Sequence, residues 1–174
     1  MIKGLLIWIV FSCCAWGGFY LYRYLKERAE TLETLADTVA ALAEAMDQDG
    51  LTLKEALQWL QSASAQGDGC ALAGHMLSAW ACPGPLPQRW SEAAERLCQQ
   101  ERGFRRLNAQ EKAWLKAMVQ DQAAAAMDPD HTKRGWVRKW QERGLQAREQ
   151  YEKKGPLYGK LGLLIGAALA ILML

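Results

Sequence analysis

The chain has 174 residues, enough for one domain of modest size, and 51% of them are hydrophobic. Its formal net charge of +2 conceals an acidic excess between Arg23 and Asp130 and a basic excess between Lys133 and Lys154. The five cysteines are odd in number and irregularly spaced, so we expect no disulfide framework.

The first predicted element is a transmembrane helix over residues 1–24. Its apolar core, Gly4 to Tyr22, would span ~28 Å as a helix, close to the thickness of a hydrocarbon core. A cleaved signal peptide and a lipoprotein leader, lipidated at Cys13, are the alternatives. No clean small-x-small cleavage site is present, and apolar residues continue well past Cys13, so we favour an uncleaved anchor.

Residues 25–155 predict a compact, all-α cytoplasmic bundle of about five or six helices. The first span is expected to continue into a helix that ends within Asp47–Gly50, with apolar residues at heptad a and d positions. These residues either pack inside this chain, which we favour, or form an intermolecular coiled coil. They are Leu25, Leu32, Leu35, Val39, Leu42 and Met46.

Capping residues and prolines divide the rest of the bundle into helices. Thr52-x-x-Glu55 and Asn108-x-x-Glu111 are helix-start patterns, and Asp128 followed by Pro129 is another. The segments "QGDG" and "CPGPLP" predict breaks. The last bundle helix is expected to end near Lys154, where "GP" would separate it from the membrane.

Residues 156–174 predict a second transmembrane helix. The apolar run from Leu157 to Leu174 would span ~27 Å, and Lys160 can extend toward the headgroups. Cations flank the inner ends of both spans, so the positive-inside rule places the loop between them in the cytoplasm and both termini outside.

Small residues recur at four-residue steps in both apolar segments, a spacing that allows close helix packing, although chance glycines are common in such segments. They are Gly162, Gly166 and Ala170 in the second span, and Cys14 and Gly18 in the first.

Basic residues in the last bundle helix and near Phe104 are candidate partner sites. Aromatic residues of that helix share one stripe, which we expect in the core, and the cations lie largely off it. A solvated or lipid-facing surface, an acidic protein partner and, least favoured, nucleic acid remain alternatives. The cations are Lys133, Arg134, Arg138, Lys139 and Arg143 in the helix, and Arg102, Arg105 and Arg106 in the predicted loop.

Patterns for catalysis or metal binding are weak. Cys70, His75 and Cys82 lack the paired spacing of a zinc site, and neither a Walker loop nor a nucleophile–histidine pair is indicated. We therefore expect no cofactor, no metal and no enzymatic activity.

Two segments, "LADTVAALAEAMDQDGLTLKEAL" and "EQYEKKGPLYGKLGLLIGAALAILML", together with the apolar N-terminus, resemble the stage III sporulation protein AB family. The resemblance implies a subunit of the sporulation channel between mother cell and forespore, located in the outer forespore membrane. It also implies a helical domain similar to that of the type II secretion and pilus platform protein, which would dock a hexameric secretion-type ATPase. A regulatory or signalling membrane protein that binds another cytosolic protein is the alternative.

Overall fold

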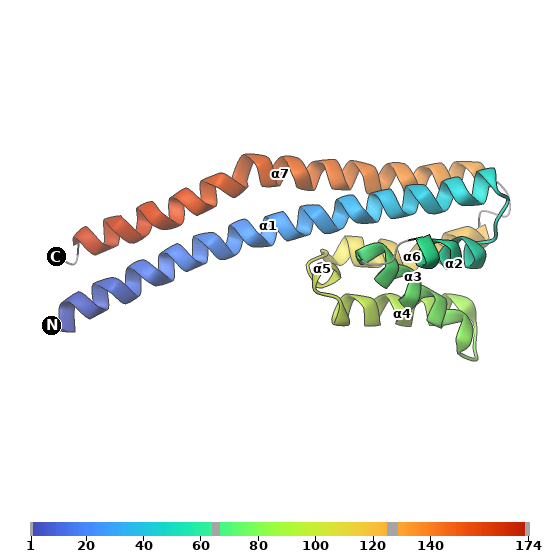
Figure 1. The fold of residues 1–174 in the computed structure, drawn as a ribbon, viewed down its shortest axis with the longest axis horizontal. Helices are drawn as coiled ribbons and strands as arrows, with labels where there is room; N and C mark the ends of the chain where they lie inside the picture. The colour runs from blue at the N-terminus through green and yellow to red at the C-terminus, as the bar shows by residue number, and fades with distance from the viewer. Residues whose placement is uncertain (1, 64–66, 125–128, 173–174) are drawn as a thin grey trace. The chain divides into compact units, whose positions relative to one another are not determined.

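The structure is a computed structural model that describes residues 2–63, 67–124 and 129–172, and the side chains of 7–63, 67–119 and 134–172 (Figure 1). The prediction of an all-α fold is confirmed, because these ranges contain helices and no strand. The helices are α1 Ile2–Gln48, α2 Leu53–Ala63, α3 Asp68–Ala81, α4 Leu86–Gln100, α5 Arg102–Arg105, α6 Ala109–Ala124 and α7 Pro129–Leu172.

The chain divides into two compact units. One, which we call the helix pair, comprises Met1–Glu30 and Leu145–Leu174, and the other, which we call the helical body, comprises Thr31–Gly144. The two long helices, α1 and α7, contribute residues to both units.

The core of the helical body includes four of the six residues of the predicted apolar stripe of α1, whereas Leu25 and Met46 are half-buried. Leu32, Leu35, Val39 and Leu42 are all buried within this single chain. Their burial confirms the intramolecular alternative over a coiled coil, because a seam kept for another molecule would be exposed here. Gly144 of α7 approaches this stripe closely, since a Cβ added there would lie 3.5 Å from the carbonyl oxygen of Leu32.

Tryptophans connect the later helices of the helical body. Trp90 of α4 is buried, and its indole N–H donates a 2.9 Å hydrogen bond to the carbonyl of Leu115 in α6. Trp140 of α7 is also buried and meets Trp114 of α6 edge-on, with ring centroids 6.0 Å apart. The prediction that the aromatic stripe of the last helix lies in the core is thus confirmed at Trp136 and Trp140.

Both predicted capping boxes are present. Before α2, the Thr52 amide donates to the Glu55 carboxylate at 2.8 Å, and the Glu55 amide donates to the Thr52 hydroxyl at 3.4 Å. The bond from the Thr52 amide, and after it a 2.8 Å bond that the Thr52 hydroxyl donates to the same carboxylate, lower the pKa of Glu55. Before α6, Asn108 and Glu111 exchange two 2.7 Å bonds of the same kind. Each box satisfies amides that the first turn of a helix would otherwise leave unpaired.

The change Asn108→Ala is expected to destabilise the chain by about 1 kcal/mol, because it leaves the Glu111 amide without its cap. Urea unfolding of the full chain in detergent, followed by tryptophan fluorescence, measures this loss. Asn108→Asp is the matched control, since aspartate keeps the acceptor oxygen and should preserve most of the stability. Equal losses in both variants would contradict the assigned role of the side-chain oxygen.

The loop before α4 follows the predicted break. Helix α3 ends at Ala81, and α4 begins at Leu86 with Pro85 in an extended conformation at its N-cap. Gly84 has a φ of 123°, a conformation that side-chain-bearing residues rarely adopt.

Two local predictions are wrong. The residues around Phe104 form the short helix α5 rather than a loop. The predicted break at Gly155-Pro156 is absent, and α7 continues through Pro156 to Leu172 (Figure 1). Proline removes one backbone hydrogen bond, and packing can outweigh that cost. In the helix pair, α7 packs against α1 on both sides of Pro156, at Tyr151 and at Gly162.

Candidate functional site

The predicted cations of α7 separate into two groups. Lys139 and Arg143 lie over internal aromatic rings: the Lys139 ammonium is 5.2 Å from the Trp114 ring centroid, and the Arg143 guanidinium carbon is 5.1 Å from it. Arg143 also donates a 3.1 Å hydrogen bond to the Gln110 side chain. Cation–π contacts of this kind contribute roughly 0.5–2 kcal/mol each. These two cations therefore help to attach α7 to α6.

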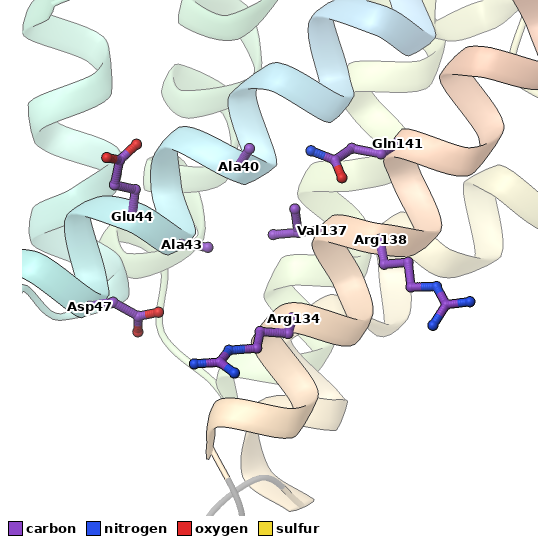
Figure 2. A pocket seen from close by; sticks show the side chains of 8 residues that line it. All are labelled: Ala40, Ala43, Glu44, Asp47, Arg134, Val137, Arg138 and Gln141. Carbon is purple, nitrogen blue, oxygen red and sulfur yellow. The ribbon is translucent and has the colours of Figure 1, made fainter.

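The second group, Arg134 and Arg138, borders a groove between α1 and α7 in the helical body (Figure 2). The groove has a volume of about 440 Å³. It is lined by Ala40, Ala43, Glu44 and Asp47 of α1, and by Arg134, Val137, Arg138 and Gln141 of α7.

Arg138 projects into solvent, with 82% of its side chain exposed, and its Nε lies 2.8 Å from the Glu142 carboxylate one turn away. An exposed pair of this kind adds little stability, so Arg138 is not needed to hold the fold. The side chain of Lys133, a further predicted partner residue, lies outside the described residues.

The other cationic candidates lie on or beside α5. Phe104 is fully buried and anchors this short helix, while Arg102 and Arg105 are exposed and Arg106 is half-buried. Arg105 donates a 2.7 Å hydrogen bond to the carbonyl of Gln99, and Lys112 donates a 3.2 Å bond to the carbonyl of Arg105. The sequence did not single out Lys112, because only the turn after α5 brings α6 to this cluster.

Gly103 fixes α5 against the start of α3. A Cβ added there would lie 2.5 Å from the Thr31 hydroxyl and 3.1 Å from the Asp68 carboxylate, so no larger residue fits without movement. Burial raises the pKa of Asp68, and a hydrogen bond with Thr31 opposes that rise. This contact holds the cations of α5 at a defined place on the helical body.

The residues of the weak metal-binding pattern do not form a metal site. Cys70 and His75 belong to α3 and Cys82 follows its end. Within the described residues, no group of three His, Cys, Asp or Glu side chains could hold a metal ion. His75 instead lies 3.9 Å from the Glu101 carboxylate, beside a shallow cleft of about 380 Å³.

The C-terminal part of α7 is suited to a membrane. Among the described residues, the one helix long and apolar enough to cross a bilayer runs from Arg134 to Leu172, and 17% of its most apolar window is buried. Leucine and isoleucine side chains there are largely exposed, including Leu163, Leu164 and Ile171. The described part of α1 contains no such apolar window, so the first span stays a prediction.

Small residues bring the two helices of the helix pair into close contact. A Cβ on Gly162 would lie 2.8 Å from the Cys14 carbonyl oxygen and 2.9 Å from the Gly18 Cα. A Cβ on Gly166 would lie 3.3 Å from the Cys14 Cβ. Four of the five predicted packing residues are thus neighbours, and Ala170, the fifth, is half-buried. Whether this contact forms inside a bilayer remains a prediction.

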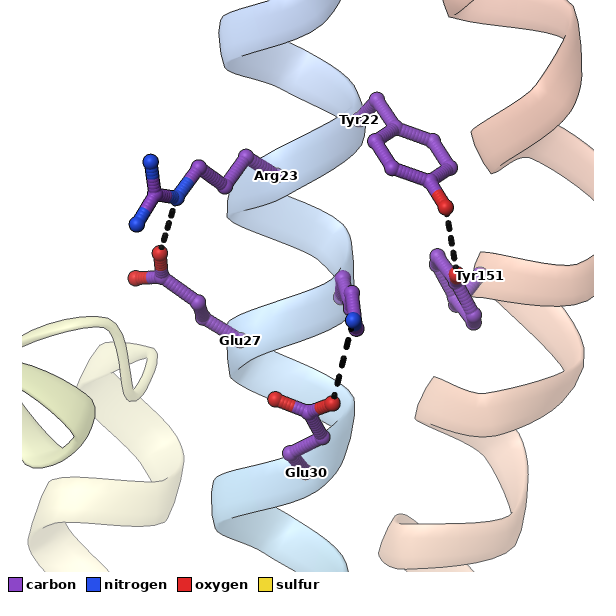
Figure 3. A network of polar contacts seen from close by, with 6 residues as sticks. Tyr22, Arg23, Glu27, Glu30 and Tyr151 are labelled. Atoms are coloured by element: carbon purple, nitrogen blue, oxygen red, sulfur yellow. Dashed lines mark hydrogen bonds and ion pairs between the residues drawn. The ribbon is translucent and has the colours of Figure 1, made fainter.

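A tyrosine pair lies in the same unit, and the sequence did not predict it. The Tyr22 and Tyr151 hydroxyls are 2.8 Å apart, with ring centroids separated by 5.6 Å (Figure 3). On the outer side of α1, Arg23 pairs with Glu27 at 2.8 Å. Tyrosine is enriched where apolar helices meet polar surroundings, which is the sequence signal for Tyr22, and Tyr151 lies on the aromatic stripe of its helix.

One protein-family model matches residues 3–174 and describes stage III sporulation protein AB. No curated protein and no solved structure matches the chain significantly. Because the family match extends over essentially the whole length, from an apolar N-terminus through the helical body to the apolar end of α7, the chain belongs to the stage III sporulation protein AB family.

Proposed function

We propose that this sporulation protein is a non-catalytic membrane scaffold subunit of a transport channel between mother cell and forespore, and that it docks a cytoplasmic secretion-type ATPase to the membrane assembly. One observation carries the proposal. The single helix α7 contributes Trp136 and Trp140 to the core of the helical body and, further along, an exposed apolar segment suited to lipid. A partner bound to the helical body would thus be joined to the membrane through α7.

The proposed membrane arrangement has two spans, residues 1–24 and 156–174, with the helical body in the cytoplasm and both termini outside. The close approach of Gly18 and Gly162 supports it, because small residues allow helices in lipid to pack at short distance. Cations beside both apolar segments, such as Arg23 and Lys153, support the cytoplasmic side for the helical body.

For an acidic surface of the ATPase, we favour the α5 cluster, defined as Arg102, Arg105, Arg106 and Lys112, over the cations of α7. Arg134 and Arg138 share their groove with Glu44 and Asp47, which offset their charge. Lys139 and Arg143 are engaged with Trp114. Clustered positive charge attracts an acidic partner and raises its association rate.

Co-purification of a secretion-type ATPase with the full-length protein from membranes tests this site. The double reversal Arg102→Glu with Arg105→Glu is expected to reduce ATPase recovery at least about tenfold, since truncating or reversing interfacial charges costs several kcal/mol. Lys54→Glu with Arg96→Glu, at exposed cations on α2 and α4, is the matched control and should leave recovery unchanged.

Unchanged recovery after the α5 reversal would eliminate this docking site. Failure of the unaltered protein to retain any such ATPase would instead favour the alternative function, a regulatory membrane protein whose helical body binds another cytosolic protein. Trp59, 45% exposed on α2, offers an aromatic contact for such a partner.

A further inference from the structure

The acidic and basic residues of the groove between α1 and α7 lie on opposite sides of it. Glu44 and Asp47 lie along the α1 side, and Arg134 and Arg138 lie along the α7 side, with the small side chains of Ala40 and Ala43 between them (Figure 2). All four charged residues are exposed, whereas Ala40, Ala43 and Val137 are half-buried. The groove therefore has an apolar floor with an acidic side and a basic side.

We propose that this groove is an interface between two copies of the chain. A second copy is the occupant that carries the complementary pattern, because its own groove presents two acids beside two arginines. The proposal goes beyond the docking of an ATPase and uses none of the residues of the α5 cluster.

The position of the charges selects one symmetry. The helices run antiparallel in the helical body, since Gly144 lies beside Leu32 and Arg134 shares the groove with Asp47. Acids and arginines thus flank the same end of the groove. A twofold axis along the groove places α1 of one copy against α7 of the other at the same level, so that acids meet arginines.

A twofold axis across the groove gives the opposite result. It places α1 against α1 and α7 against α7, and like charges across an interface are unfavourable. The favoured axis also leaves the two copies of α7 parallel, as expected for copies that share a membrane orientation. The interface is isologous and closes as a dimer.

Arg138 can serve such an interface although it is paired with Glu142. The Glu142 contact uses its Nε, and a guanidinium has four further N–H donors that can bind a carboxylate of the second copy. The small floor residues allow helix backbones to approach closely. Confinement in a membrane would strengthen association of two copies through effective concentration.

Two charge-reversal variants of the full chain test the proposal. Glu44→Arg with Asp47→Arg makes the groove wholly basic, and Arg134→Glu with Arg138→Glu makes it wholly acidic. Two differently tagged copies are co-expressed, solubilised in mild detergent and recovered through one tag. Copies of the unaltered protein are expected to co-purify, and each variant should co-purify with itself at least about fivefold less, because like charges then meet.

Mixing the basic variant with the acidic variant is expected to restore recovery to within about twofold of the unaltered protein, since both contacts across the axis become attractive again. This restoration also shows that both variants fold. Exchanging the exposed Glu95–Lys116 pair, through Glu95→Lys with Lys116→Glu, is the matched control and should change nothing.

Three results would each overturn the proposal: no co-purification of the unaltered copies, full self-association of either variant, or failure of the mixed pair to recover. Loss of ATPase binding would not affect these outcomes, and a normal ATPase recovery in the two groove variants would show that the two surfaces act separately.

Discussion

Replacing Gly162 with leucine is expected to separate the two helices of the helix pair, whereas the same replacement at Gly159 should leave them together. At Gly162 an added Cβ would meet backbone atoms of Cys14 and Gly18 at 2.8 and 2.9 Å. Backbone cannot move aside as a flexible side chain can, so the helices must part. At Gly159 an added Cβ meets nothing within 4 Å.

The partner helix provides a second matched comparison. A Cβ on Gly18 would lie 2.6 Å from the Tyr158 carbonyl oxygen, while its neighbour Gly17 has open space. Gly18→Leu should therefore act as Gly162→Leu does, and Gly17→Leu should be tolerated. All four changes add the same apolar side chain, so differences between them cannot arise from hydrophobicity.

Cross-linking measures the separation. Cysteines replace Tyr22 and Tyr151, whose ring centroids are 5.6 Å apart, in a chain whose five native cysteines are changed to alanine, and a short thiol cross-linker joins them in membranes. Overpacking typically costs ~1–3 kcal/mol, so the cross-linked fraction should fall at least about fivefold in the Gly18 and Gly162 variants. Equal cross-linking in all four variants would contradict the close packing of these helices.

Local sequence patterns were sufficient where the structure depends on near neighbours. Thr52 and Asn108 each cap a helix through a glutamate three residues away, a spacing that the sequence displays directly. The burial of the α1 stripe could be predicted in the same way, because apolar residues that recur at helical spacing lie on one face of the helix.

Sequence patterns gave wrong or incomplete predictions where contacts between distant parts of the chain determine the structure. The continuation of α7 through Pro156 depends on packing against α1, and propensity alone favoured a break. The cations of α7 could not be told apart in the sequence. In the fold, Lys139 and Arg143 lie over the Trp114 ring of α6, whereas Arg138 is exposed to solvent. The groove was unpredictable for the same reason, because Asp47 and Arg134 are brought together only by the fold.

Loss of the Trp90 side chain should be among the most damaging changes to the helical body. Trp90 is 2% exposed, meets Trp80 edge-on with ring centroids 6.0 Å apart, and bonds the Leu115 carbonyl. Trp90→Ala is expected to lower the free energy of unfolding by about 3–5 kcal/mol, from lost burial and the cavity left behind. Urea unfolding of the full chain in detergent, followed by far-ultraviolet circular dichroism, measures the change.

A comparison of two Trp→Phe variants isolates the hydrogen bond within that loss. Trp90→Phe removes a donor that is satisfied, whereas Trp140→Phe removes an indole N–H that is buried without a hydrogen-bond partner among the described residues. An unsatisfied buried donor costs roughly 1–3 kcal/mol, so deleting it offsets part of the lost volume at Trp140. Trp90→Phe should therefore be the more destabilising change by about 1 kcal/mol or more. Trp59→Phe, at an exposed site, should stay within about 0.5 kcal/mol of the unaltered protein. An equal or larger loss at Trp140 would show that ring volume, rather than the bond to Leu115, determines what tryptophan contributes at these two positions.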